Sequence, residues 1–106
     1  MISIRIHPIF KNYSYNIQND EIVHIPTNKN VTQHITHSGY AICTVSDEKN
    51  HKTMLSHRLI WEWCNDIIPH GYEIDHINKI KNDNKITNLR CITMMENRKI
   101  EIIQIL

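Results

Sequence analysis

The stretch EIDHINKIKNDNKITNLRCITMMEN, residues 73–97, decides the fold of this chain. A short strand is expected over residues 73–76. A polar, asparagine-rich loop over 77–89 separates it from a second short strand at 90–93. A helix is expected directly after the second strand. In this order of elements, the end of the first strand and the first turns of the helix can meet.

The start of that helix carries a signal of its own. Thr93-Met94-Met95-Glu96 fits a capping box, in which the Thr93 side chain caps the helix and Glu96 reaches back. The helix is expected to run to about Ile102. The apolar tail over residues 102–106 either packs back onto the core or forms a surface for a partner.

Polar side chains at these element ends are the candidates for chemistry. Asp75 offers a carboxylate oxygen and Asn97 an amide oxygen, and both are hard ligands suited to Mg²⁺. His76 is a candidate general base for activating water, because an imidazole titrates near neutral pH. Successive strand residues point to opposite faces, so the backbone must twist at the strand end if Asp75 and His76 are to serve one site. Asn88 is a candidate for holding the loop, and so the imidazole, by side-chain-to-backbone hydrogen bonds.

The first half of the chain alternates apolar and polar residues in short runs, which is typical of antiparallel strands. Residues 27–34 show no clear pattern. Pro8 and Pro26 each end a run, because proline cannot donate a hydrogen bond to a sheet. The expected strands lie before Pro8 and over residues 13–17, 21–25, 40–45 and 52–55.

A helix is expected between these strands and the stretch at 73–97. Ser56 is expected to cap it, and it should run from His57 to about Asn65. Its apolar positions recur at helical spacing, so one face should pack on the core. That face carries Leu59, Ile60, Trp63 and Cys64.

Length and composition bound the class of protein. A chain of 106 residues forms one domain, or one domain with a β-rich annex. The three cysteines are widely spaced, and none forms a pair at zinc spacing, so we expect free thiols in a reducing compartment and no structural zinc. No signal peptide or transmembrane run is visible, so the expected protein is soluble and intracellular, with no membrane partner.

Positive charge gathers in the last third of the chain, although the net charge is only +1. Residues 1–75 carry six Lys/Arg and eight Asp/Glu, whereas residues 76–106 carry six and three. Local basic charge of this kind fits a phosphate backbone. A solvated loop in a lysine-rich sequence is the alternative, and charge alone does not separate the two. The basic residues are Lys79, Lys81, Lys85, Arg90, Arg98 and Lys99.

Taken together, these residues resemble the HNH endonuclease family, above all the homing endonucleases of phages and other viruses. The resemblance is specific over residues 57–97 and includes the spacing, with twelve residues from His76 to Asn88 and nine from Asn88 to Asn97. Asn78-Lys79 stands where many relatives have Asp-Gly. The matching pieces are His57-Arg58-Leu59-Ile60, Gly71-Tyr72-Glu73-Ile74-Asp75-His76, Asn84, Asn88-Leu89-Arg90, Thr93 and Glu96-Asn97.

The resemblance implies an α+β fold with a ββα-metal core of the HNH, or His-Me finger, type. This core would span residues 57–106 and follow an antiparallel β-rich module over residues 1–56. One divalent cation, Mg²⁺ or alternatively Mn²⁺, would be bound by Asp75 and Asn97. His76 would be the general base, and Asn88 would orient it.

The implied activity is metal-dependent hydrolysis of phosphodiester bonds in double-stranded DNA. One site cuts one strand, so a monomer would nick DNA, and a double-strand break would need a dimer or two events. For His57, which also matches the family, a packing role is favoured. A structural role fits Arg58 and Arg90 as well as a phosphate contact does. The candidate DNA-binding residues are Arg58, Lys79, Lys81, Lys85, Arg90 and Arg98.

Two other functions fit parts of the sequence. The chain could be a DNA-binding module that keeps the nuclease fold with little or no catalysis, although the complete set of chemical residues favours an enzyme. It could also be an interaction module that forms a homodimer through the hydrophobic tail from Ile100 to Leu106.

Overall fold

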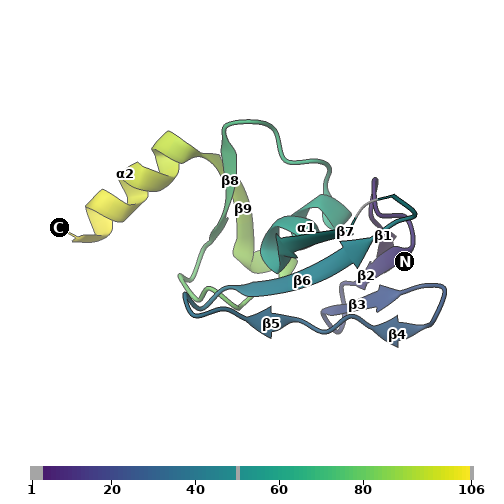
Figure 1. Ribbon diagram of the computed structural model, residues 1–106. Coiled ribbons are helices and arrows are strands. Elements are labelled where there is room, and N and C mark those ends of the chain that lie inside the picture. Colours follow the sequence, from purple (N-terminus) through teal and green to yellow (C-terminus); the bar gives the residue numbers. More distant parts are fainter. Residues whose placement is uncertain (1–3, 50, 106) are drawn as a thin grey trace.

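Short alternating runs build the first half of the chain as antiparallel strands, as the sequence predicts (Figure 1). The computed structural model describes residues 4–49 and 51–105. Helix α1 follows β7 directly, and a 3₁₀ turn at Ile86–Asn88 leads into β9. The elements are β1 (Ile4–Ile6), β2 (Tyr13–Asn16), β3 (Glu21–His24), β4 (Lys29–Asn30), β5 (His34–Ile35), β6 (Ala41–Ser46), β7 (His51–Leu55), α1 (Ser56–Cys64), β8 (Tyr72–His76), β9 (Leu89–Thr93) and α2 (Met94–Ile105).

The strands of the described residues form three antiparallel sheets, each built from neighbours in sequence. The sheet orders are β1-β2-β3-β4, β5-β6-β7 and β8-β9. The two-residue strands β4 and β5 lie at sheet edges within or next to the segment 27–34, for which the sequence predicted no element. They form by pairing with the longer strands β3 and β6, so their own residues carry little signal.

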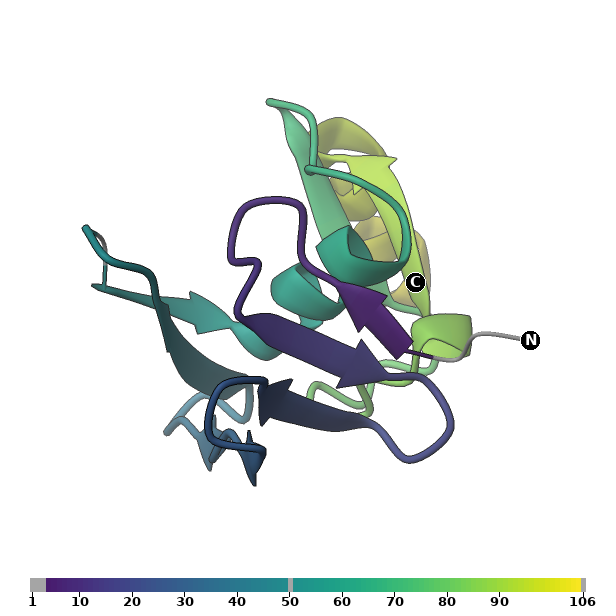
Figure 2. The same ribbon diagram turned by 90° about the vertical axis from the view of Figure 1, so that its right-hand side faces the viewer.

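Helix α1 lies at the centre of the molecule and packs against strands of all three sheets. Figure 2 shows it between the N-terminal sheet and the β8–β9 hairpin. Its predicted apolar face is confirmed, because Leu59, Ile60 and Trp63 are buried and Cys64 is half-buried. Alternate residues of β6 also point inward, and Cys43 and Val45 are buried there.

The prediction that Ser56 caps α1 is wrong. The N-cap is Leu55, which has an extended backbone and makes no side-chain capping bond. Ser56 is the first helical residue and is fully buried. Because β7 runs into α1 without a turn, the serine is carried into the interior and is not left at an exposed helix entrance.

Helix α2 projects away from the sheets, with the C-terminal end of the helix farthest from them (Figure 1). The predicted cap is confirmed in its first half, because the Thr93 Oγ1 accepts a hydrogen bond from the Glu96 backbone N–H at 3.1 Å. The helix continues three residues beyond the predicted end, to Ile105. The side chains of residues 101–106, on which the predicted dimer surface depends, lie outside the described part of the chain.

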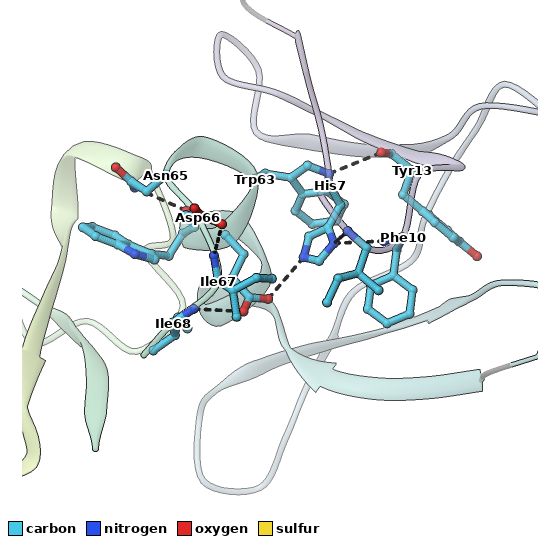
Figure 3. Close-up of polar contacts among 11 residues, drawn as sticks. His7, Phe10, Tyr13, Trp63, Asn65, Asp66, Ile67 and Ile68 are labelled. Atoms are coloured by element: carbon cyan, nitrogen blue, oxygen red, sulfur yellow. Dashed lines mark hydrogen bonds and ion pairs between the residues drawn. The ribbon is translucent and has the colours of Figure 1, made fainter. Parts of the chain in front are cut away.

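A buried histidine ties the N-terminal segment to α1 (Figure 3). The His7 Nδ1 accepts hydrogen bonds from the backbone N–H groups of Ile9 and Phe10, both at 3.0 Å. The proton on Nε2 is therefore available to the Glu62 Oε1, at 3.2 Å. The second oxygen of Glu62 accepts the N–H of Ile68 at 3.3 Å. One side chain of α1 thus satisfies groups on both flanking segments.

The hydrophobic core draws on both sides of the predicted boundary at residue 56. Tyr15 and Val45 are fully buried in the same cluster as Leu59, Trp63 and Leu89. The division into modules over 1–56 and 57–106 stays a prediction, and the observed packing joins the two stretches in one core. The three cysteines are free thiols, and burial raises the pKa of each.

Candidate active site

The end of the β8–β9 hairpin opens into a cavity of about 550 Å³. Asp75 and His76 line it from β8, and Asn97 lines it from the first turns of α2. The chain turns immediately after His76, where the Lys79 N–H donates to the His76 carbonyl at 3.0 Å. The expected change of direction at the strand end is present, and three of the four predicted chemical residues share one cavity.

Asp75 is buried and is held by two cationic side chains. Its Oδ2 accepts a hydrogen bond from the Arg90 Nε at 2.9 Å and lies 2.8 Å from the Arg90 Nη2. Its Oδ1 lies 3.4 Å from the Lys79 Nζ. Asp75 and Arg90 are direct partners in the β8–β9 ladder, so the pair follows from the strand register. A structural role and a phosphate contact were both left open for Arg90. The pair with Asp75 gives Arg90 the structural role.

His76 is oriented by an asparagine of the loop. Its Nε2 lies 2.7 Å from the Asn84 Oδ1. With the amide oxygen as acceptor, the ring carries its proton on Nε2 and leaves Nδ1 with a lone pair that can accept a proton. Asn84 matched the family pattern but was not among the predicted site residues, because nothing local in the loop shows which asparagine reaches the ring.

Asn88 does not contact His76 in the hydrogen bonds of the described residues. It instead joins two parts of the loop that carries Asn84. Its Oδ1 accepts the N–H of Asn78 at 3.0 Å. Its Nδ2 donates to the Asn78 Oδ1 at 2.9 Å and to the Asp83 carbonyl at 2.8 Å. The Ile77 N–H donates to the Asn88 carbonyl at 2.8 Å. These bonds fix the loop that carries Asn84, and the direct orientation of His76 by Asn88 stays a prediction.

Asn97 is positioned by an acidic residue that the sequence reasoning missed. The Asn97 Nδ2 donates to the Glu73 Oε2 at 2.7 Å, which leaves the amide oxygen as the free acceptor of that side chain. Glu73 also lines the cavity. The signal that could have found it is its spacing, because Glu73 and Asp75 are two residues apart on a strand and therefore share one face.

Two further rings wall the cavity. The His57 ring centroid lies 4.6 Å from that of His76, and the Tyr40 ring stacks on His57 at 5.7 Å. His57 is only 5% exposed. The packing role favoured for His57 agrees with this burial, but the residue also borders the candidate base. Tyr40 brings the N-terminal half of the chain into the site.

The pKa of His57 is lowered to about 4, first by burial and then by the nearby charges of His76 and Arg58. The unfolded chain takes up this proton near the ordinary histidine pKa of 6.5, whereas the folded chain resists it. Stability from this group is therefore complete above pH 6.5 and is lost as the pH falls toward 4, by about 3 kcal/mol. We expect His57→Gln to flatten the fall in the free energy of unfolding across this pH range. Urea unfolding at several pH values measures it, and an unchanged slope would contradict the assignment.

Of the six predicted DNA-binding residues, Arg90 pairs with Asp75, and the other five divide into two groups. Arg58, Lys79 and Lys81 line the cavity. The Lys81 Nζ donates to the Ser38 carbonyl at 3.0 Å and lies 5.1 Å from the Tyr40 ring centroid. Lys85 and Arg98 are exposed outside the cavity-lining set. The structure therefore places basic side chains both inside the cavity and on the neighbouring surface.

The donor set fits one hard divalent cation. Among residues 4–49 and 51–105, no group of three or more His, Cys, Asp or Glu side chains is arranged to hold a metal ion. Asp75 and Asn97 instead offer one carboxylate and one amide oxygen to the same cavity, and Mg²⁺ commonly takes its remaining ligands from water and phosphate. The ammonium group of Lys79 beside the Asp75 Oδ1 shows that this oxygen attracts positive charge.

The chain resembles HNH endonucleases in part of its sequence and in its fold. Residues 55–99 match the family model described as HNH endonuclease. The solved structure of the HNH homing endonuclease I-HmuI, which binds and cleaves DNA, matches the chain with a TM-score of 0.84 at 22% sequence identity. The match covers 97% of this chain and 59% of that one, so the chain spans well under two thirds of the homing endonuclease. Comparison with curated protein sequences finds no match.

The comparison confirms the predicted α+β class with a ββα core. It also confirms the homing-type HNH resemblance that the residues at 57–97 carry. In the part of the chain that the structure describes, neither helix combines the length and apolar character needed to cross a bilayer.

Proposed function

We propose that the chain is a metal-dependent endonuclease that nicks one strand of double-stranded DNA inside the cell. The observation that carries this is the convergence of Asp75, His76 and Asn97 on one cavity. Asp75 and His76 lie on β8, and Asn97 lies on α2. The fold of the β8–β9 hairpin onto α2 brings the three side chains together. Lysine and arginine side chains at the same cavity support a polyanionic substrate.

In this proposal the Nδ1 of His76 takes a proton from a water molecule, and the water oxygen attacks phosphorus. The bond from phosphorus to the 3′-oxygen breaks, and the 3′-oxygen takes a proton from solvent, which leaves a 5′-phosphate and a 3′-hydroxyl. Asn84 keeps the ring in the tautomer that can accept the proton. Asp75 and Asn97 would hold Mg²⁺ or Mn²⁺, which would neutralise charge on the phosphoryl and leaving oxygens. Arg58 and Lys81 would bind flanking phosphates.

The test is a cleavage assay on supercoiled plasmid. We expect nicked circles in Mg²⁺ or Mn²⁺, no product in EDTA, and mapped ends with a 5′-phosphate. Purified wild-type chain that leaves the plasmid intact in both metals would contradict the proposal.

A second function has one observation in its favour. Both oxygens of Asp75 already have cationic partners, Arg90 and Lys79, as they would in a module that binds DNA without metal. A gel shift without cleavage in Mg²⁺, Mn²⁺ and Ca²⁺ would favour this binding module. A homodimer through the segment from Ile100 to Leu106 is a separate proposal, and sedimentation of the full chain tests it.

A further inference from the structure

Lys79 occupies an unusual backbone position for a residue with a long side chain. Its φ angle is 66°, in the left-handed region that favours glycine. The turn that contains it is fixed from both sides, by its own N–H on the His76 carbonyl and by the bonds from Asn88 to Asn78. The chain therefore places a lysine where glycine would be free of strain, and the side chain lines the cavity.

The two oxygens of Asp75 are held unequally. Arg90 directs both Nε and Nη2 to Oδ2, at 2.9 and 2.8 Å, with a planar guanidinium from the paired strand. The ammonium of Lys79 contacts only Oδ1, at 3.4 Å, from a side chain that is 36% exposed. The contact to Oδ1 is the longer and weaker of the two, and its donor sits on a flexible stem.

We propose that Lys79 is a tethered cation that holds the Asp75 Oδ1 until a divalent cation replaces it, and so sets the metal affinity of the site. Arg90 stays in place and keeps the carboxylate oriented, whereas Lys79 leaves. The inference rests on the proposed function, because it concerns the same cation. A metal ion that approaches Oδ1 must compete with the ammonium, so the ion pair weakens apparent metal binding by the stability of the pair itself.

The expected size follows from the exposure of the lysine. Exposed ion pairs contribute about 0.2–1 kcal/mol, so removing the ammonium should tighten metal binding by about 1.4- to fivefold. The effect should shrink as salt concentration rises, because salt screens a partly exposed pair. The displaced ammonium remains at the cavity, where a phosphate of the substrate would lie.

The experiment is a titration of the full chain with Mn²⁺ in the absence of DNA. The free ion is measured by electron paramagnetic resonance at each step. We expect Lys79→Met and Lys79→Gly to bind Mn²⁺ about 1.4- to fivefold more tightly than the wild type, and Lys79→Arg to stay close to it. Lys81→Met is the matched control, because it removes one positive charge from the same cavity without touching Asp75. It should change the Mn²⁺ affinity less than Lys79→Met does.

Three results would overturn the inference: unchanged or weaker binding by Lys79→Met, equal tightening by Lys81→Met, or tightening by Lys79→Gly alone. The last would assign the effect to the left-handed backbone and not to the ammonium.

Failure of the proposed function would give a different set of results from failure of this inference. A chain that binds Mn²⁺ through Asp75 and shows the Lys79 effect, but cleaves no DNA, upholds the inference and rejects the nuclease. If Asp75→Asn leaves Mn²⁺ binding unchanged, both are rejected.

Discussion

We expect His76→Ala to lower the rate of plasmid nicking by about 10²–10⁴-fold, the contribution of a positioned general base. The ring is buried at the end of β8, and Asn84 holds its Nε2. The measurement is the single-turnover rate of conversion of supercoiled to nicked plasmid at saturating Mg²⁺.

The matched control for this loss is His70→Ala, which removes an exposed histidine from the turn before β8. It should nick at the wild-type rate. Because His76 packs against the rings of His57 and Tyr40, each variant should first be checked for folding by circular dichroism. His76→Gln is a second variant of similar length that lacks a titratable base. A folded His76→Gln with wild-type nicking would remove the base from the mechanism.

Asn84 acts through His76 and is a positioning residue, so its variant should separate orientation from chemistry. Asn84→Ala should reduce nicking less than His76→Ala and should shift the pH profile of the rate, because the tautomer of the ring is no longer held. A loss of rate with an unchanged pH profile would indicate a structural role for Asn84.

The largest effect on stability is expected for Trp63→Ala, which should lower the free energy of unfolding by about 3–5 kcal/mol. Trp63 is almost fully buried on α1 and joins the helix to the N-terminal strands. Its ring stacks with Tyr15 at 6.2 Å and meets His7 edge-on at 5.3 Å. Its Nε1 donates to the Tyr13 carbonyl at 3.3 Å. Alanine would leave a cavity at the junction and one carbonyl without its donor.

Trp63→Phe separates the two contributions. It keeps an aromatic ring in the junction and loses the hydrogen bond, so we expect a smaller loss of about 1–2 kcal/mol. Trp61→Ala is the surface-facing control on the same helix, because Trp61 is only half-buried and packs at the margin of the core. Urea unfolding followed by circular dichroism measures all three. If the free energy of unfolding of Trp63→Ala lay within about 1 kcal/mol of the wild-type value, the junction would contribute little to stability. That result would contradict the role inferred from its packing.

Much of the fold could be predicted from local pattern. A few adjacent residues are enough to predict each of several features. These are the alternation in β2, β3, β6 and β7, the apolar face of α1 and the Thr93 cap of α2. The same holds for the layout around residues 73–97, where strand, loop, strand and helix follow signals at known spacing. One local prediction failed. Ser56 is of a residue type that commonly caps helices, but β7 runs directly into α1 and buries this serine.

The opening stretch thus predicted, without a structure, that Asp75, His76 and Asn97 lie close together, and the three residues line one cavity. Only the tertiary structure showed which atoms meet there. Strand register pairs Asp75 with Arg90, the folded loop brings Asn84 to the imidazole, and the left-handed turn directs Lys79 to the carboxylate. The contact between His7 and Glu62, 55 residues apart, is likewise a product of packing. Sequence pattern records the preferences of neighbouring residues, whereas partners distant along the chain are chosen by how the elements pack.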